Sequence, residues 1–304
     1  MSNIKKPKVS IGMAVYNGEN FVAKRLESLL SQTLSDFELI ISDDSTDSTP
    51  TICKEFANKD KRIRYFHNEK KTGWKNSYIF LLNEAKSDYF VWASVDDIWS
   101  PDFLEKNVNV LESNKNLVGS ISKIDLYGSS YKNELKLSSS DSTLRKLYKK
   151  IRLSFRPFGA WPLYGSYEKR ASLCLRKTTP AILYSVFRTD KLRQCIHHEY
   201  GGTWDYITLL CVLEYGELHV IDEVLLHYYA GGMSTHGSIY SYKHGLIRFV
   251  EVLFPFFYLT KWCLRHFGIK FLLKNIDHFI WRTFYGWVGF AIEIYRLTIR
   301  RNKI

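Results

Sequence analysis

The chain has 304 residues, enough for one or two domains with a full hydrophobic core. Its apolar fraction of 45% and charged fraction of 24% exclude a disordered chain, a collagen-like fibre and a small disulfide scaffold. The net charge of +12 is unevenly placed, because residues 1–120 carry −1 and residues 243–304 carry +8. This distribution argues against a nucleic-acid partner and fits an enzyme with a basic tail.

The first 120 residues alternate between strand-like and helix-like segments. Residues 9–15 form a continuous apolar run, and residues 20–32 then place Leu26, Leu29 and Leu30 on one helical face. Strands separated by helices of this length predict right-handed β-α-β units and an α/β fold with a mostly parallel sheet. The expected strands are residues 9–15, 37–41, 63–67, 89–94 and 117–121; the expected helices are 20–32, 48–58, 74–86 and 101–114, with Pro101 as the first helical residue of the last.

The second part of the chain is less regular. Residues 123–160 predict a long loop or lid with some helix, and residues 180–187 predict a strand. A helix follows over residues 204–215, which Thr203 can cap and Gly216 can end, and residues 217–226 return as a strand. From residue 242 onward, aromatic and basic residues interleave in predicted helices.

Cysteine usage and the N-terminal sequence indicate a cytoplasmic protein. The five cysteines lie far apart without a CxxC pair, which argues against a disulfide framework or a zinc site. Residues 1–10 lack the apolar core of a signal peptide. The best candidate stretches, residues 252–260 and 283–292, are too short for a membrane-crossing helix, so only attachment to a membrane surface stays open.

Polar residues follow three of the predicted strands. Tyr16 follows the first, Asp43 and Asp44 the second, and Asp96 and Asp97 the fourth. In open parallel sheets ligands bind outside the carboxyl ends of the strands, so these side chains should meet at one edge.

Adjacent carboxylates at Asp96 and Asp97 repel each other and need a cation to be held together. Mg²⁺ or Mn²⁺ binds through one or two protein carboxylates and completes its shell with phosphate oxygens and water. The alternative is a solvated loop, or a cap for the helix near Pro101.

The other acidic loop holds Asp43, Asp44 and Asp47. We expect Asp47 to cap the following helix, and one of the preceding pair either to cap it as well or to accept a hydrogen bond from a base N–H, such as the imide of uracil. No GxGxxG follows residues 9–15 and no GxxxxGK[ST] occurs, which leaves a metal, rather than a glycine loop, to handle phosphate.

Two stretches carry a resemblance to a known family. KVSIGMAVYNGENFVAKRLESLLSQTLSDFELIISDDSTD resembles the start of family 2 glycosyltransferases of the GT-A fold, and YFVWASVDDIWSPDFLEKN resembles their metal-binding block. The resemblance is specific over about residues 7–115 and looser over 180–240. It implies an inverting enzyme that uses a nucleoside-diphosphate sugar, with a donor half at residues 1–122, an acceptor half at 123–242 and a helical basic and aromatic tail at 243–304.

The resemblance also implies roles for individual residues. Ala14, Tyr16, Asp43 and Asp44 match the positions that hold the base, with Asp44 preferred for a uracil contact. Asp96 matches the position near the ribose, and Asp97 matches the metal ligand. Asp205 matches the catalytic base. This sequence has Ser94 at the first position of the D-x-D motif, and Trp204 before Asp205 where the family often has glutamate.

A mechanism follows from charge. Mn²⁺ or Mg²⁺ on Asp97 would offset the charge of the leaving diphosphate, and Asp205 at a helix N-terminus would take the proton of the acceptor hydroxyl. Arg188, His227 and His236 are candidates for contact with the diphosphate or the acceptor, although each also fits a solvated or structural role.

The tail combines many Phe, Tyr and Trp residues with Lys and Arg, a composition typical of helices at the surface of anionic membranes. The alternatives are packing on the catalytic domain and a dimer interface. Membrane contact would suit a glycan or lipid-linked glycan acceptor in cell-surface polysaccharide assembly, with the protein peripheral on the inner face of the membrane.

Two other functions stay open. A sugar nucleotidyltransferase would share a nucleotide-binding sheet but should carry a glycine-rich basic loop after the first strand. A catalytically inactive relative could serve as an assembly module at a membrane surface.

Overall fold

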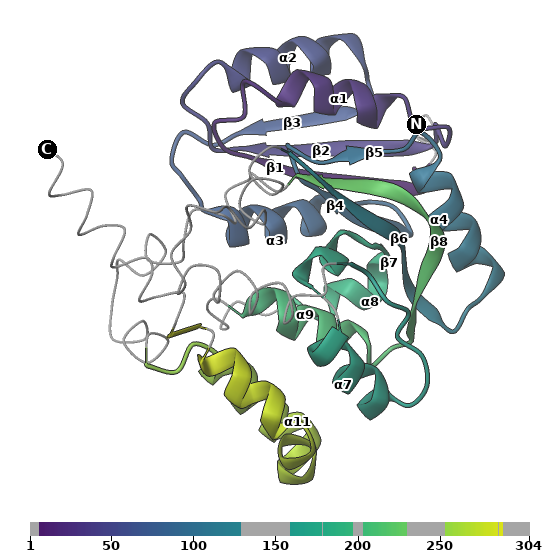
Figure 1. Ribbon diagram of the computed structural model, residues 1–304. Helices are drawn as coiled ribbons and strands as arrows, with labels where there is room; N and C mark the ends of the chain where they lie inside the picture. The colour runs from purple at the N-terminus through teal and green to yellow at the C-terminus, as the bar shows by residue number, and fades with distance from the viewer. Residues whose placement is uncertain are drawn as a thin grey trace, which may run out of the picture.

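The computed structural model describes residues 6–128, 159–177, 179–196, 203–229, 253–284 and 286–287. Within these ranges, one mixed sheet of eight strands forms the centre, in the order β3-β2-β1-β4-β7-β6-β8-β5 (Figure 1). The strands are β1 (Val9–Val15), β2 (Phe37–Asp43), β3 (Ile63–His67), β4 (Tyr89–Ala93), β5 (Ile98–Trp99), β6 (Leu117–Tyr127), β7 (Val186–Arg188) and β8 (Glu217–Tyr229).

Helices cover both sides of the sheet. The first two helices lie together on one side of the parallel strands and the third on the other (Figure 1). The described helices are α1 (Val22–Leu30), α2 (Thr49–Lys59), α3 (Trp74–Glu84), α4 (Phe103–Ser113), α7 (Tyr167–Lys177), α8 (Thr189–Arg193), α9 (Trp204–Val212) and α11 (Phe257–Lys274), with a short 3-10 helix η1 (Pro180–Tyr184).

The parallel half of the fold agrees closely with the prediction. β1 pairs in parallel with β2 and β4, and β2 with β3, through a core of apolar side chains. The register places Val15 beside Asp43 and Met13 beside Ala93, so the strands that precede the acidic loops end at the same edge. The predicted strands at residues 9–15 and 63–67 are confirmed, and the predicted helices there differ by a few residues at their ends.

The second half departs from the prediction in several places. Residues 180–187 were expected to form one strand, but Pro180 begins η1 and only residues 186–188 are extended. Residues 123–127, expected in a loop, continue β6 because β8 pairs with them. The helix expected to start at Pro101 begins at Phe103. The rest of the expected lid lies largely outside the described residues.

The ends of α9 also differ from expectation. The Thr203 side chain makes no capping hydrogen bond, and α9 ends at Val212, before Gly216. Gly216 has another role, because a Cβ there would lie 2.4 Å from the carbonyl oxygen of Asn116. Only glycine lets the chain pass this close to the start of β6.

The C-terminal helix α11 packs through one face on the part of the chain that holds α7. Trp262, Cys263 and Phe271 of α11 are buried, and the rings of Tyr167 and Phe267 lie 4.8 Å apart. All five cysteines of the chain are buried with free thiols. Within the described ranges, every helix is too short or too polar to cross a bilayer.

Replacing Gly216 with alanine should destabilise the fold, because the new Cβ meets backbone that must shift. We expect the free energy of unfolding to fall by about 1–3 kcal/mol, measured by urea denaturation. Glu214→Ala, at an exposed neighbouring position, is the control and should change stability by less than about 0.5 kcal/mol. Equal stability of the two variants would contradict the close approach.

Candidate nucleotide-sugar site

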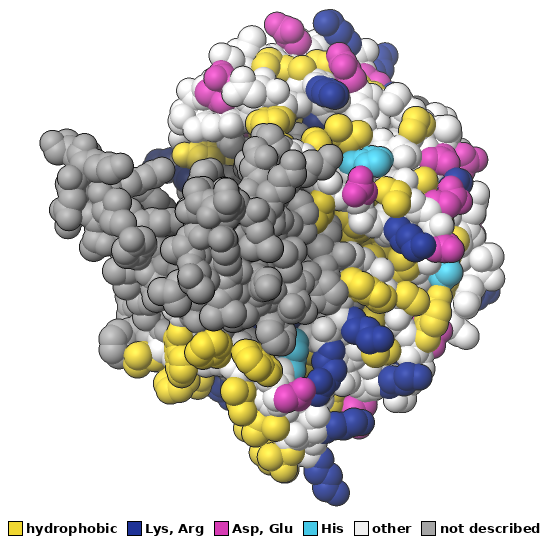
Figure 2. Space-filling model, in the orientation of Figure 1, with side chains coloured by type: hydrophobic (Ala, Val, Ile, Leu, Met, Phe, Trp, Pro, Cys, Tyr) yellow, Lys and Arg dark blue, Asp and Glu magenta, His cyan; other side chains and the backbone are white. Residues whose placement is uncertain are grey.

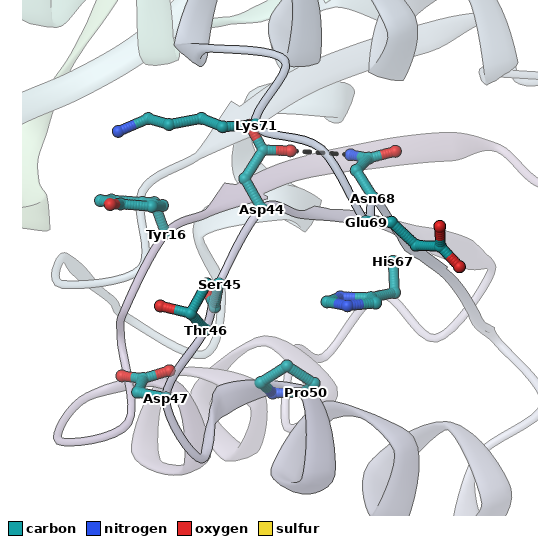
Figure 3. Close-up of a pocket in the computed structure, with 10 residues that line it drawn as sticks. All are labelled: Tyr16, Asp44, Ser45, Thr46, Asp47, Pro50, His67, Asn68, Glu69 and Lys71. Atoms are coloured by element: carbon teal, nitrogen blue, oxygen red, sulfur yellow. Dashed lines mark hydrogen bonds between the residues drawn. The ribbon is translucent and has the colours of Figure 1, made fainter.

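The carboxyl ends of β1, β2 and β4 bring the predicted polar residues to one edge of the sheet. The amide of Asp44 donates to the carbonyl of Val15 at 3.0 Å, which joins the ends of β1 and β2. A cavity of about 460 Å³ opens here, with Tyr16, Asp44, His67 and Lys71 in its wall. The rings of Tyr16 and His67 lie on opposite sides of it, with Asp44 between them (Figure 3).

Asp44 is held rigidly by the loop that follows β3. Its carboxylate accepts hydrogen bonds from the side-chain amide of Asn68 at 2.8 Å, the backbone N–H of Thr72 at 2.9 Å and the backbone N–H of Gly73 at 3.0 Å. Burial alone would raise the pKa of Asp44, but these hydrogen bonds outweigh it and the pKa lies below its ordinary value. Asp44 therefore faces the cavity as a fixed anion.

Asp43 and Asp47 have different surroundings. Asp43 is fully buried, where its carboxylate accepts from the amide of Ser45 and from the hydroxyl of Tyr65, both at 2.8 Å, and it does not line the cavity. Asp47 accepts from the backbone N–H of Thr49 at 3.0 Å, so its expected role at the start of α2 is confirmed.

Residues 94–97, the acidic turn, follow β4. Asp97 is 2% exposed, and its Oδ1 accepts from the backbone N–H of Tyr229 at 2.8 Å, while Oδ2 has no hydrogen-bond partner. Burial, followed by the charge of Asp96, raises the pKa of Asp97 to about 7. Asp96 accepts from the Ser94 hydroxyl, and its backbone carbonyl accepts from the Tyr127 hydroxyl.

A buried arginine lies next to this turn. Arg25 of α1 donates through Nε to the carbonyl of Ser94 at 2.9 Å and lies over the ring of Trp99 at 4.4 Å. Its two terminal nitrogens are buried without a hydrogen-bond partner. Burial lowers the pKa of Arg25 to about 10, against the opposing effect of Asp97 and Asp96, so the guanidinium stays charged at neutral pH.

The carboxylates of the acidic turn are the candidate ligands for a metal ion. Among the described residues, no three His, Cys, Asp or Glu side chains are grouped as metal ligands. Mg²⁺ and Mn²⁺ do not need such a group when phosphate and water complete the shell. The unpartnered Oδ2 of Asp97, beside a second carboxylate, fits an ion that is bound largely through a substrate diphosphate.

Asp205 lies in the first turn of α9. Its carboxylate accepts from the amide of Tyr206 at 2.8 Å, and burial raises its pKa to about 6 against the opposing charge of Arg282. The neighbouring Trp204 is fully buried and packs edge-on against Trp92 of β4, with ring centroids 6.0 Å apart. This aromatic contact ties the start of α9 to the strand that leads into the acidic turn.

The remaining candidates are placed apart from one another. Arg188 pairs with Tyr89 at the amino end of β4 and donates to the carbonyls of Leu111 and Leu117, so it lies away from the carboxyl edge. His227 lies on β8, with Nδ1 3.9 Å from a carboxylate oxygen of Asp125. Ala14 is the second-last residue of β1, two positions before Tyr16. His236 lies outside the described residues.

Some residues of this site were not singled out from the sequence. Arg25 follows Val22 by three positions and precedes Leu29 by four, a spacing that places a charged residue on the buried face of its helix. The loop after β3 has no paired carboxylates, and Asn68 and Thr72 within it gave no comparable signal.

Comparison with known proteins identifies the fold and the family. A Staphylococcus aureus structure, TarS 1-349 in complex with UDP, matches 81% of this chain and 65% of its own with a TM-score of 0.54 and 18% identity. The mannosyltransferase PcManGT from Pyrobaculum calidifontis, in complex with GDP-Man and Mn²⁺, matches 97% and 76% with a TM-score of 0.56 and 12% identity. Sheet and helices therefore have the GT-A arrangement of glycosyltransferases, as expected.

Sequence relatives agree with this class. Uncharacterised glycosyltransferases of Rickettsia felis and Haemophilus influenzae are 38% and 33% identical over 42% and 40% of this chain. The matches span 22% and 38% of those relatives, so the chain covers less than half of their length. The family model described as glycosyl transferase family 2 matches residues 10–169, and the chain belongs to that family.

The raised pKa of Asp97 predicts how stability depends on pH. Between about pH 4 and pH 7 the folded protein keeps a proton that the unfolded chain releases, so the free energy of unfolding falls as the pH rises. Asp97→Asn carries no charge. Without metal, it should be more stable than the wild type at about pH 8, with the difference vanishing near pH 4.

Chemical denaturation at both pH values measures this difference. Asp222→Asn is the control, because Asp222 is exposed and paired with Lys123 and should give no gain at the higher pH. If Asp97→Asn raised the free energy of unfolding equally at both pH values, ionisation of the Asp97 carboxylate would not be the cause of the pH dependence.

Proposed function

We propose that this chain is an inverting glycosyltransferase that moves a sugar from a nucleoside-diphosphate sugar, UDP-sugars preferred, to a hydroxyl acceptor. The observation that carries this is a cavity lined by Asp44 and a buried acidic turn at the carboxyl ends of β1, β2 and β4, with an aspartate of raised pKa at the start of α9. Residues 1–122 would hold the donor and residues 123–242 the acceptor.

The cavity would hold the nucleoside. A carboxylate oxygen has two lone pairs, so Asp44 can accept the imide N–H of uracil beside its hydrogen bonds from the protein. Tyr16 is 37% exposed on the cavity wall, where its ring can stack on a base, and Lys71 lies 3.7 Å over that ring. UDP and UDP-GlcNAc complexes of TarS support this choice of nucleotide.

Asp97, with Asp96 near the ribose, would hold Mn²⁺ or Mg²⁺ together with the donor diphosphate. When bound there, the ion supplies positive charge against the developing charge of the leaving group. Arg25 adds a fixed positive charge on the protein side of the same turn. The Mn²⁺ complex of PcManGT supports a divalent ion in this fold.

Asp205 would act as the base. The acceptor oxygen attacks the anomeric carbon, its proton passes to the Asp205 carboxylate, and the bond between that carbon and the diphosphate oxygen breaks with its electron pair on the leaving group. One displacement inverts the anomeric centre. The position in the first turn of α9 favours the ionised form, while burial keeps the pKa close to 6.

The acceptor would be a glycan or lipid-linked glycan in cell-surface polysaccharide assembly. The protein would work in the cytoplasm, peripheral on the inner face of the membrane. The basic and apolar C-terminal segment supports this location.

Nucleotide binding tests the donor site directly. Thermal unfolding with UDP, GDP or TDP, each with and without Mn²⁺, should show a shift of several degrees for UDP with Mn²⁺, because the ligand binds only the folded state. Asp97→Ala should lose the Mn²⁺ dependence, and Asp44→Ala the response to UDP. A shift with UDP that is the same in both variants would contradict the assignment.

The pH dependence of turnover tests Asp205. Its carboxylate must be ionised to accept a proton, so the rate of nucleoside-diphosphate release should fall about tenfold per pH unit below about pH 6. Arg282→Met removes a positive charge that lowers the pKa of Asp205, so the fall in rate should begin at a higher pH. Lys59→Met, an exposed change on α2, should not move this pH. Asp205→Asn should lose about 10²–10⁴-fold in rate.

A further inference from the structure

The C-terminal segment, residues 253–287, is fixed to the catalytic half by polar contacts. Arg176 of α7 pairs with both carboxylate oxygens of Asp277 at 2.7 Å, and Asn275 is fully buried and accepts from the Ser172 hydroxyl at 2.7 Å. The segment therefore presents a defined outer face.

That outer face is apolar. Its exposed apolar side chains recur every three or four residues in two helical stretches, which follow the kink at Gly268 and are divided at Asn275, and they are 47–62% exposed. Figure 2 shows hydrophobic side chains gathered over this part of the molecule. We call these residues the apolar stripe: Ile269, Leu273, Ile276, Ile280, Phe284 and Trp287.

An apolar groove of about 410 Å³ opens beside the stripe. Phe254, Phe257, Ile280 and Phe284 line it together with Trp287, whose indole N–H donates to the carbonyl of Leu253 at 2.7 Å. An exposed surface of this kind marks a site of contact with a partner or a membrane.

Basic residues accompany the stripe along the chain. Lys261, Arg265 and Lys270 are exposed and pair with no acidic side chain in the described part of the chain. Asp277, the one acidic residue among the described residues 253–287, already pairs with Arg176. A second copy of the chain on this face would bring the same positive charges together, whereas an acidic lipid surface would neutralise them.

We infer that the apolar stripe, the groove and these basic residues form a docking surface for a bilayer of acidic phospholipids. Aromatic and aliphatic side chains enter the boundary between headgroups and acyl chains, and the Lys and Arg side chains meet lipid phosphates. The groove accepts part of an acyl chain.

Docking at this face also places the base near the bilayer. Arg282 of the same segment lies 4.2 Å over the ring of Tyr206, the residue after Asp205, and 5.4 Å from the ring of Phe256 in the groove. On the proposed function, on which this part rests, the acceptor hydroxyl is delivered close to the membrane surface.

Vesicle co-sedimentation of the full chain tests the surface. We expect binding to vesicles that contain phosphatidylglycerol and little binding to phosphatidylcholine alone. Replacing Leu273, Ile276 and Ile280 together by serine should weaken binding at least about tenfold. Replacing Lys261, Arg265 and Lys270 by glutamine should weaken binding and its dependence on salt. Val224→Ser, an equally exposed apolar residue on β8, is the matched control and should bind as the wild type does.

Three outcomes would overturn the inference. The first is equal binding of wild type and serine variant, and the second is equal binding to both vesicle types. The third is a wild-type dimer in sedimentation equilibrium that the serine variant lacks, which would assign the stripe to a second copy. The UDP shift, measured without vesicles, separates this result from failure of the proposed function, because the stripe variants should keep it.

Discussion

The burial of charge behind the acidic turn is the constraint around which this edge of the fold is built. Asp97 and Arg25 are each 2% exposed, yet Oδ2 of Asp97 and both terminal nitrogens of Arg25 lack hydrogen-bond partners. Burial lowers the pKa of Arg25 and raises the pKa of Asp97, and the charge of each group partly offsets this effect on the other. The length of β8, which delivers the amide of Tyr229 to Asp97, and the docking of α1 on Ser94 both serve this arrangement.

Asp44 and Asp97 show how one sheet edge gives two aspartates opposite properties. Asp44 has its carboxylate held by hydrogen bonds from the loop after β3, which lower its pKa and suit an acceptor of fixed orientation. Asp97 has one oxygen left unbonded, and its burial, followed by its acidic neighbour, raises its pKa, which on the proposed function suits it to a cation. The two demands fit a ligand with a hydrogen-bond donor at one end and a diphosphate with its metal at the other.

The sequence predicted the parallel half of the fold because its signals there are local. Runs such as VSIGMAV and YFVWA are buried on both faces, and Asp47 caps a helix two residues away. The parts it missed depend on contacts far along the chain. The extension of β6 exists because β8 pairs with it, two-residue β5 exists because His227 and Leu226 lie beside it, and Thr203 leaves its cap unmade because tertiary packing buries its hydroxyl.

The site was predicted to the same extent. Asp44 and Asp97 follow strands, where sequence pattern points directly, whereas Asp205 was assigned mainly from the family resemblance. Arg25 was missed because a charged residue among apolar ones is ordinarily interpreted as the edge of a helix face. Its contact with the acidic turn depends on how α1 packs in the folded chain. Arg188 was predicted to contact the diphosphate or the acceptor, but it donates to carbonyls near the amino end of β4. The sequence does not reveal this structural role, because it depends on how β7 pairs with β4.

The buried cysteines can report local opening of the fold. Cys53, Cys174, Cys195, Cys211 and Cys263 are distributed over α2, α7, the end of α8, α9 and α11. Burial raises the pKa of Cys53 and Cys263 to about 12, so neither thiol reacts readily until its layer separates from the rest. The order in which a thiol reagent labels them therefore gives the order in which the layers of this molecule open, without any added probe.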